Sequence, residues 1–422
     1  MHVCILYDCL FPWTVGGGEK WYRQMAEGYA AAGHRVTYLT LRQWDDDDPP
    51  VIPGVSVLAV GPRLKLYADG KRRILPPLIY GLGVFRHLLF NGRRYDLLHG
   101  ASFPFFSVLA AGVLRPFFRF RLAVDWIEVW TDDYWRTYLG PLGGIGIAVQ
   151  KMCARVPQIG FSLSRLHLER ARALGVTDMT LLEGTFLEGE ELLRQPRAGP
   201  PEVLYAGRMI PEKRVLLLVD ALADLMRDDK DLRATLIGKG PDEAAVARRI
   251  SDHGLEERIA QLGFVDLEIL RAAQSHAAVL VQPSEREGYG LVVVESAYRG
   301  VPVIVVPGSD NASVELIEPG ENGFVAAEPT PGALARAIRE ALDGRDDLRR
   351  RTSDWYDKNR ARLSFARSFE IILAKLRDAG LGRSAGDDSQ SARTAGQPLG
   401  TPLEGSQARA EEKQSRVRSA AE

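Results

Sequence analysis

Short β-rich runs alternate with helical patterns along most of this chain, and this alternation limits the folds open to it. The first unit has a strand at residues 3–7, a glycine-rich loop at 15–18, a helix from about 19 to 32 and a strand at 36–40. A strand, loop, helix and strand within about 40 residues is the signature of a doubly wound parallel sheet. Further candidate strands lie at residues 55–60, 97–99, 121–125 and 158–163.

The alternation lapses at residues 183–201 and then starts again. This stretch is charged and rich in proline and glycine, which is typical of an interdomain linker. Two Rossmann-like halves joined by a linker predict a ligand between them, at the carboxyl ends of the strands. In the second half, candidate strands lie at 203–206, 234–237, 259–262, 278–282 and 303–306, with helices at 215–226 and 242–251.

These patterns divide the chain into five segments. We expect a first Rossmann-like domain over residues 1–182, a linker at 183–200 and a second Rossmann-like domain over 201–352. Residues 353–381 have the pattern of helices that could pack back onto the first domain. The segment 382–422 has almost no large apolar residue, so it cannot bury enough surface to offset its ordering entropy, and we expect it to be disordered.

Composition excludes several classes of protein. The hydrophobic fraction is 45%, the charged fraction 26% and the net charge −1, which suits a globular protein and argues against nucleic-acid binding. The cysteines Cys4, Cys9 and Cys153 show no metal spacing and are expected to be buried thiols. No basic leader precedes the first strand, and the apolar runs near 74–90 and 101–114 are short and interrupted, so we expect a cytoplasmic protein without membrane spans.

The first of four candidate binding loops follows the strand at 203–206. It carries Arg208 and Lys213, five residues apart. An arginine can bind phosphate oxygens bidentately and a lysine adds a point charge, so this pair suits a diphosphate. Taken alone, the pattern also fits a solvated loop with two surface cations.

Two further loops give weaker signals. Gly238 and Gly240 lie in a strand-to-helix turn, where glycines permit close approach of the backbone to a ligand, although most such pairs only shape a turn. Phe264 and Val265 follow the strand at 259–262 and could wall a nucleobase pocket or simply belong to the core.

The strongest signal is the segment 283–297, Pro-Ser-Glu-Arg-Glu-Gly-Tyr-Gly-Leu-Val-Val-Val-Glu-Ser-Ala. A helical pattern begins near Leu291. The N–H groups of Tyr289, Gly290 and Leu291 are therefore expected to point at a ligand phosphate, with the helix dipole behind them.

Two carboxylates, Glu287 and Glu295, lie eight residues apart in this segment. Glu287 is in the loop and Glu295 is about one turn into the helix. Carboxylates are strong acceptors for diols, so we expect one to meet sugar hydroxyls and the other the two ribose hydroxyls. An idle carboxylate in the apolar stretch 291–297 would be costly, and the alternative for Glu295 is a salt-bridged helix residue.

Taken in this order, the segments resemble a known family. The phrase Pro-Ser-x-x-Glu-Gly-Tyr-Gly-Leu-Val-x-x-Glu-Ser-Ala-x-x-Gly-Val-Pro-Val-Ile resembles the Glu-x7-Glu region of the retaining glycosyltransferases of family 4, which have the GT-B fold. The resemblance covers residues 1 to about 378. Its other parts are a diphosphate clamp at 207–213, a late turn at 315–324, and a first β-α-β unit marked by 16–19 and 33–37.

The resemblance implies an α/β protein with two Rossmann-like domains facing each other across a cleft, and a nucleoside diphosphate sugar as donor. It implies that Arg208 and Lys213 bind the diphosphate, that Glu287 touches the donor sugar and that Glu295 binds the ribose. It also implies that three glycines approach the β-phosphate from the other side of the cleft, namely Gly16, Gly17 and Gly18.

One position departs from the family. Many relatives place a histidine near the donor sugar in the segment that resembles residues 121–130, and here Ile127 stands in its place. Asp125 or Glu128 could serve instead. His99 is a weaker candidate, because it also fits a satisfied core histidine, and we keep it with Ser102 and Trp126 as candidates for contact with the acceptor.

The first half is expected to choose the acceptor, and it carries many cations between residues 63 and 121. Acidic residues are few there, and aromatic or aliphatic residues interleave with the cations. That composition suits an anionic membrane surface or a lipid-linked acceptor, and equally a helical face whose cations are solvated. The cations are Arg63, Lys65, Lys71, Arg72, Arg73, Arg86, Arg93, Arg94, Arg115, Arg119 and Arg121.

The resemblance implies a retaining transfer by front-face attack, in which the departing diphosphate takes the acceptor proton. We expect no metal and no cofactor, because the acidic run 45–48 has the pattern of a solvated loop. The acceptor is left open as a lipid-linked or other glycan or a small natural product. Two other classes stay open: another GT-B enzyme, such as an epimerase or a phosphorylase, and an inactive nucleotide-sugar-binding protein.

Overall fold

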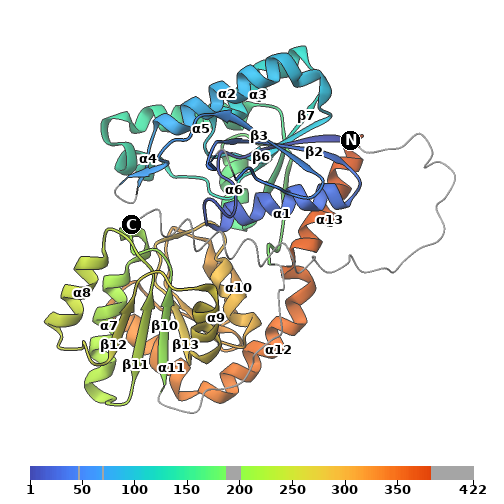
Figure 1. The fold of residues 1–422 in the computed structure, drawn as a ribbon. Coiled ribbons are helices and arrows are strands. Elements are labelled where there is room, and N and C mark those ends of the chain that lie inside the picture. Colours follow the sequence, from blue (N-terminus) through green and yellow to red (C-terminus); the bar gives the residue numbers. More distant parts are fainter. Residues whose placement is uncertain (46–47, 69–70, 187–200, 382–422) are drawn as a thin grey trace, which may run out of the picture.

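The computed structural model of the protein describes residues 1–45, 48–68, 71–186 and 201–381 (Figure 1). Most of the expected linker at 183–200 and the whole of the expected disordered segment at 382–422 lie outside the described residues. The described chain forms two parallel sheets, one in each half, each covered by helices on both faces.

The first sheet has seven parallel strands in the order β3-β2-β1-β6-β7-β8-β9. Side chains alternate across it: Val3 and Ile5 face α1, while Cys4 and Leu6 belong to the core on the opposite face. The strands are β1 (His2–Leu6), β2 (Arg35–Leu41), β3 (Val55–Gly61), β6 (Leu97–Ala101), β7 (Arg121–Asp125), β8 (Ile159–Ser162) and β9 (Met179–Leu181).

Helix α1 (Gly17–Ala31) covers one face of this sheet, and α2 (Leu75–Asn91) and α3 (Phe106–Leu114) cover the other. Near them are α4 (Asp132–Leu139), α5 (Gly143–Arg155) and α6 (Arg165–Ala173).

The second sheet has six parallel strands in the order β12-β11-β10-β13-β15-β17. Its order reverses between β10 and β13, and parallel sheets of this kind bind ligands at such a switch point. The strands are β10 (Glu202–Ala206), β11 (Arg233–Ile237), β12 (Ile259–Leu262), β13 (Val279–Gln282), β15 (Val303–Val305) and β17 (Gly323–Val325). The helices are α7 (Val215–Asp228), α8 (Glu243–Asp252), α9 (Leu267–His276), α10 (Leu291–Tyr298) and α11 (Pro331–Asp343).

Helix α12 (Arg345–Leu363) begins inside the segment that the sequence pattern assigned to the second domain. Its first turns are so rich in charge that they hide the helical periodicity. They are nevertheless anchored: the buried Arg349 guanidinium donates to the carbonyl oxygens of Ala277, at 2.5 Å, and Ser275, at 3.2 Å.

Helix α13 (Phe365–Asp378) then returns to the first domain and lies beside α1 (Figure 1). The Phe369 ring packs edge-on against Tyr29 with 5.1 Å between ring centroids, and Phe365 packs against Trp21 at 5.5 Å. Gly28 permits this approach, because a Cβ there would lie 3.2 Å from the Phe369 ring. The buried apolar side chains thus form one continuous core from the first sheet through α13 to the second sheet.

None of the helices in the described ranges is long and apolar enough to cross a membrane.

Replacing Phe369 with alanine tests this shared core. We expect Phe369→Ala to lower the free energy of unfolding by about 3–5 kcal/mol, because the lost ring leaves a cavity between α13 and α1. Urea unfolding followed by tryptophan fluorescence measures the change. Arg367→Ala, which removes an exposed residue from the same helix, is the control and should change stability by less than about 0.5 kcal/mol. A Phe369→Ala loss no larger than that of the control would contradict the packing role.

Candidate functional site

The centre of the site is the Glu287 carboxylate, which is held from two sides. Lys213, at the end of a short helical turn (Pro211–Lys213), and Gln282, the last residue of β13, both donate hydrogen bonds to its Oε1. The Lys213 and Glu287 side chains are 15% and 14% exposed. The structure therefore brings these two predicted residues into contact with each other, so a bound diphosphate would share Lys213 with Glu287.

Helix α10 begins at Leu291, as the sequence pattern predicts, and Gly290 precedes it with φ +97°. Only glycine fits there, since a Cβ would also lie 2.5 Å from the Ser313 Cβ. No side chain caps this helix, and the first N–H groups of a helix lack intrahelical partners. The Tyr289 side chain is buried, and its hydroxyl donates to the Glu183 carbonyl oxygen at 3.1 Å.

Glu295 lies on α10 and faces the first domain. Its side chain is 24% exposed, and its Oε1 is 3.9 Å from the Lys20 Nζ on α1. This distance makes a weak ion pair, so Glu295 keeps acceptor capacity for hydroxyl groups. The two predicted carboxylates thus differ: Glu287 Oε1 accepts from two donors, whereas Glu295 has one distant ion-pair partner and is partly exposed.

Arg208 is exposed in the loop that follows β10. The Tyr205 hydroxyl donates to its carbonyl oxygen at 2.7 Å, which fixes the backbone while the guanidinium extends from it. The positive charge of Arg208 acts on Glu19 of the first domain, so the two domains meet electrostatically at this loop.

The predicted glycines Gly16, Gly17 and Gly18 form the start of α1. Beside them is a residue without a predicted role, Glu19, whose Oε2 is 2.4 Å from where a Gly16 Cβ would be. Burial raises the pKa of Glu19, and the charges of Arg72 and Arg208 oppose the rise. A β-phosphate that binds this helix terminus would therefore meet the Glu19 carboxyl group.

The predicted glycines Gly238 and Gly240 are required by close backbone packing. A Cβ on Gly238 would lie 1.8 Å from the Gly207 carbonyl oxygen, and one on Gly240 would lie 2.1 Å from that of Met209. The backbone of Met209 also donates to the Lys239 carbonyl oxygen at 2.9 Å. These glycines let the turn pack against the loop that carries Arg208.

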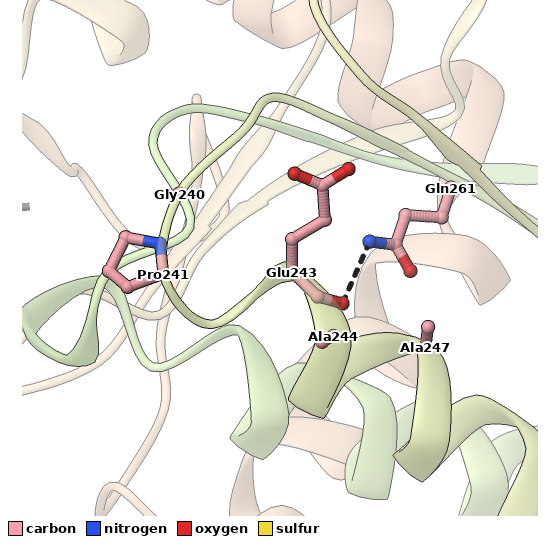
Figure 2. Close-up of a pocket in the computed structure, with 6 residues that line it drawn as sticks. All are labelled: Gly240, Pro241, Glu243, Ala244, Ala247 and Gln261. Atoms are coloured by element: carbon pink, nitrogen blue, oxygen red, sulfur yellow. Dashed lines mark hydrogen bonds between the residues drawn. The ribbon is translucent and has the colours of Figure 1, made fainter. Parts of the chain in front are cut away.

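Phe264 is 64% exposed, and the Lys239 Nζ lies 6.0 Å from its ring centroid. Near this edge of the second domain, a hollow of about 580 Å³ lies between α8 and β12 (Figure 2). The Gln261 amide crosses it and donates to the Glu243 carbonyl oxygen at 3.1 Å. The residues that line it are Gly240, Pro241, Glu243, Ala244, Ala247 and Gln261, so the hollow is separate from the Glu287 network.

Arg286, which no sequence pattern singled out, makes several contacts between the domains. Its guanidinium lies 3.4 Å from the Tyr134 ring centroid and 5.0 Å from that of Trp130. Its Nη2 is 3.1 Å from the Glu128 Oε2, and its Nε is 3.6 Å from the Asp310 Oδ2. A desolvated cation between aromatic rings and two carboxylates holds the Glu287 loop against the first domain.

A second set of contacts supports this one. The Arg170 Nη1 donates to Asp310 at 2.6 Å. The Glu315 carboxylate accepts from the backbone N–H groups of Arg165 and Leu166, both at 2.8 Å, and so caps the start of α6. The late turn of the second domain thereby anchors a helix of the first.

Ile127 and Glu128 lie directly against the Glu287 loop. A Cβ built on Gly288 would be 2.8 Å from the Glu128 Cγ and 2.9 Å from the Ile127 carbonyl oxygen. Burial tends to raise the pKa of Glu128, but the charge of Arg286, the hydrogen bond from Trp130 and the charge of Lys213 oppose it, so the pKa lies below its ordinary value and the carboxylate is ionised. Glu128 therefore lies beside the Glu287 loop and is the ion-pair partner of Arg286, while its predicted role near a donor sugar stays a prediction.

His167 is a further residue that the sequence analysis missed. Its Nδ1 accepts from the Val129 N–H at 3.2 Å, so the proton of the neutral ring is on Nε2, which is buried without a hydrogen-bond partner. Burial lowers the pKa of His167 to about 4, partly opposed by Glu128. The ring is thus neutral at pH 7 and sits behind Glu128.

Asp125 and His99 lie in the buried core of the first domain. The Asp125 carboxylate accepts from Trp21 Nε1 and Tyr22 Oη, both at 2.8 Å, and is 2.9 Å from His99 Nε2. The other nitrogen of His99 is 2.9 Å from the Tyr29 hydroxyl. With every polar atom engaged, this network fixes α1 on the sheet and leaves no free group for a substrate.

Ser102 and Trp126 are buried too. The Ser102 N–H donates to the Asp125 carbonyl oxygen at 2.9 Å, and the Trp126 Nε1 donates to Gln158 at 2.9 Å. In the described ranges no three His, Cys, Asp or Glu side chains gather as a metal site would require, and the three cysteines are buried thiols.

The comparisons with known proteins agree with this architecture. The family model described as Glycosyl transferase 4-like domain matches residues 16–181, and the one described as Glycosyl transferases group 1 matches residues 191–357. The chain belongs to this glycosyltransferase family. Together the two matches take in both sheets, which confirms the resemblance that the Glu-x7-Glu segment indicated.

The curated relatives of this glycosyltransferase-family chain match it in part. Alpha-D-kanosaminyltransferase of Streptomyces kanamyceticus is 30% identical over 154 residues, which are 36% of this chain and 39% of the relative. Glycogen synthase of Mycobacterium tuberculosis (strain ATCC 25618 / H37Rv) is 31% identical over 150 residues, 36% of either chain. The chain thus spans less than two fifths of the length of these relatives.

Solved structures match nearly the whole described chain. Sucrose-phosphate synthase from Thermosynechococcus elongatus superposes with a TM-score of 0.72 at 20% identity, covering 90% of this chain and 99% of its own. Anabaena HepE in complex with UDP-glucose superposes with a TM-score of 0.68 at 16% identity, and the match covers 90% of this chain and 100% of the HepE chain. WaaG, a glycosyltransferase involved in lipopolysaccharide biosynthesis, superposes with a TM-score of 0.65 at 17% identity. The match covers 89% of this chain and 99% of the WaaG chain. The likeness confirms the predicted GT-B fold.

Gly288 tests whether the close approach of the two domains matters to this family member. A methyl group there must push the Glu287 loop away from Ile127 and Glu128, so we expect Gly288→Ala to weaken donor binding about tenfold. Isothermal titration with UDP-glucose and other nucleotide sugars measures the effect. Gly332→Ala, where only the end of the Arg336 side chain lies within 4 Å at 3.8 Å, is the control. Equal affinities in both variants would show that the approach is unimportant.

The neutral His167 predicts a dependence of stability on pH. The unfolded chain protonates this residue below about pH 6.5, whereas the folded chain does so only near pH 4, so the free energy of unfolding falls as pH drops through that window. We expect His167→Asn, which keeps an acceptor for the Val129 N–H, to flatten this fall. Melting temperatures from pH 7.5 to 4.5 measure it. Parallel curves for the variant and the wild type would contradict the assignment.

Proposed function

We propose that this chain transfers a sugar from a nucleoside diphosphate sugar to an acceptor hydroxyl, with retention of the anomeric configuration. The observation that carries the proposal is the arrangement of Lys213, Gln282 and Glu287 beside the uncapped start of α10, pressed against the first domain through Gly288. In this proposal a sugar site and an anion site lie next to each other where the domains meet.

In this proposal the donor is held mainly by the second domain. Arg208, Lys213 and the N–H groups at the start of α10 bind the diphosphate, because two cations and a helix terminus favour negative charge. Glu295 accepts hydrogen bonds from the ribose, and Glu287 accepts them from the sugar. The solved HepE structures contain UDP, UDP-glucose, or UDP and glucose, which supports a donor of this class for the present chain.

The transfer proceeds on one face of the sugar. The bond between the anomeric carbon and the diphosphate oxygen breaks, the acceptor oxygen bonds to the same face, and the acceptor proton passes to the departing diphosphate. Charge grows on the leaving oxygen, so Arg208, Lys213 and the α10 dipole stabilise the transition state more than the ground state. In this proposal the protein, and not a metal ion, neutralises the charge on the leaving diphosphate. Turnover should therefore continue in the presence of the chelator EDTA.

Ile127 bears on the two rival functions. An alkyl side chain where relatives place a histidine fits a protein that binds donor without transfer, and an epimerase would act on the donor alone. Acceptor-dependent product from an acceptor panel supports transfer. Donor affinity without product would favour the binder, and conversion of the donor without acceptor would favour the epimerase.

Two substitutions test the site. We expect Arg208→Ala to lower kcat by about 10²–10³-fold, because it removes a charge that faces the leaving group. Glu295→Ala should raise the donor Kd about tenfold, because it removes hydrogen bonds to the ribose. Steady-state kinetics and titration calorimetry separate the two effects.

The control for both is Arg227→Ala, which removes an exposed cation on α7 and should leave kcat and Kd unchanged. Wild-type values for both site variants would overturn the assigned site.

A further inference from the structure

Helix α2 is apolar on both of its faces, which is unusual for a helix at a protein surface. Its inner face is buried: Tyr80, Val84 and Leu88 face the first sheet, and Gly81 packs so closely on α3 that a Cβ would lie 2.3 Å from the Phe106 Cβ. The inward packing is therefore complete without the outer side chains. Yet the outer side is also apolar and exposed, with Ile74, Leu75, Leu78, Leu82, Leu89 and Phe90.

The outer apolar side chains continue onto the neighbouring helices. The end of α3 and the turn after it (Arg115–Phe117) expose Val113 and Phe117, the latter by 74%, and α5 exposes Ile145 and Met152. Because α3 contacts both α2 and α5, these residues form one surface, which we call the outer face. Figure 1 shows α2 and α3 on the side of the first domain away from the second.

The charge on the outer face has a single sign. Its elements α2, α3, α5 and the turns at 92–94 and 115–117 contain no aspartate or glutamate. Six arginines on or beside them make no ion pair with any described residue, namely Arg86, Arg93, Arg94, Arg115, Arg119 and Arg155. An apolar surface rimmed by unpaired cations matches the boundary between acyl chains and anionic headgroups.

A second copy of the chain fits this surface poorly. A symmetric dimer places the same patch on both sides of the interface, so it would bring the arginines of one copy near those of the other. Like charges brought together in this way oppose association. The cations are instead complementary to a negative surface.

We propose that the outer face of the first domain docks onto an anionic lipid membrane. Leu82 and Phe90, which are 69% and 75% exposed, enter the acyl boundary, and the arginines bind headgroup phosphates. The surface extends beyond the basic segment 63–121 that the sequence indicated, because it includes α5.

Vesicle flotation with the full chain tests the proposal directly. The probes are vesicles of phosphatidylcholine alone and of phosphatidylcholine with 30% phosphatidylglycerol, at low and at physiological salt, without donor or acceptor. We expect binding to the anionic vesicles only, weaker at higher salt because the headgroup contacts are screened.

Variants separate the apolar and the charged contributions. Leu82→Ser with Phe90→Ser should lower the partition coefficient roughly tenfold or more, because two apolar side chains no longer leave water. Arg86→Ser with Arg94→Ser should lower it and remove most of the salt dependence. Ile269→Ser, which changes a side chain 51% exposed on α9 of the second domain, is the matched control and should bind like the wild type.

The outcomes are distinct from those of the proposed function, since donor affinity and melting temperature are measured on the same samples and should stay unchanged. Absence of binding to anionic vesicles at low salt would overturn the proposal. So would sedimentation of the wild type as a dimer that the Leu82 and Phe90 substitutions dissociate, because the outer face would then be a contact between copies. Binding to neutral vesicles that equals binding to anionic vesicles would show that the arginines play no role, and it would overturn the proposal as well.

Discussion

The packing of α13 on α1 is the constraint on which the rest of the structure depends. Phe365 and Phe369 join the core of the first domain to that of the second, so the two sheets share one apolar core although their described strands never pair across the domains. The functional groups come from both sides: Glu128 from the first domain, and Arg286 and Glu287 from the second. Their distances are therefore set by a helix that touches none of them. Because side chains in a core are close-packed, a shift of α13 would move the whole interface.

The charged groups at this interface satisfy one another. Lys213 pairs with Glu287, and Arg286 pairs with Glu128 and Asp310. A largely buried charge is costly without a partner, so this pairing stabilises the contact between the domains. Arg286 is enclosed by two aromatic rings, whereas Lys213 is 15% exposed. In the proposed function, Lys213 would therefore serve the ligand while Arg286 holds the domains together.

The sequence could predict the fold because each strand and helix has its own periodicity. It could also place Lys213 and Glu287 near each other, because their loops follow the neighbouring strands β10 and β13. It could not predict Arg286, whose partner Glu128 is 158 residues away, since single-sequence patterns do not report distant pairs. The sequence also does not distinguish residues of a buried hydrogen-bond network from residues of a reactive site. Asp125 lies at a strand end, as a catalytic residue would, but Trp21 and Tyr22 from α1 consume its acceptors.

The first domain thus has two faces with different physical demands. Towards the second domain it presents aromatic rings and paired charges, whose geometry is fixed by the shared core. On the outer face it presents apolar side chains and unpaired arginines that contribute nothing to that core, since Tyr80, Val84 and Leu88 already complete the inward packing of α2. Exposed apolar side chains lower solubility and are tolerated where they contact something. Because Figure 1 places α2 and α3 on the far side from the second domain, contact there would leave the second domain free to exchange its ligand. The separation of the two faces would allow one domain to take part in both the proposed transfer and the proposed membrane docking.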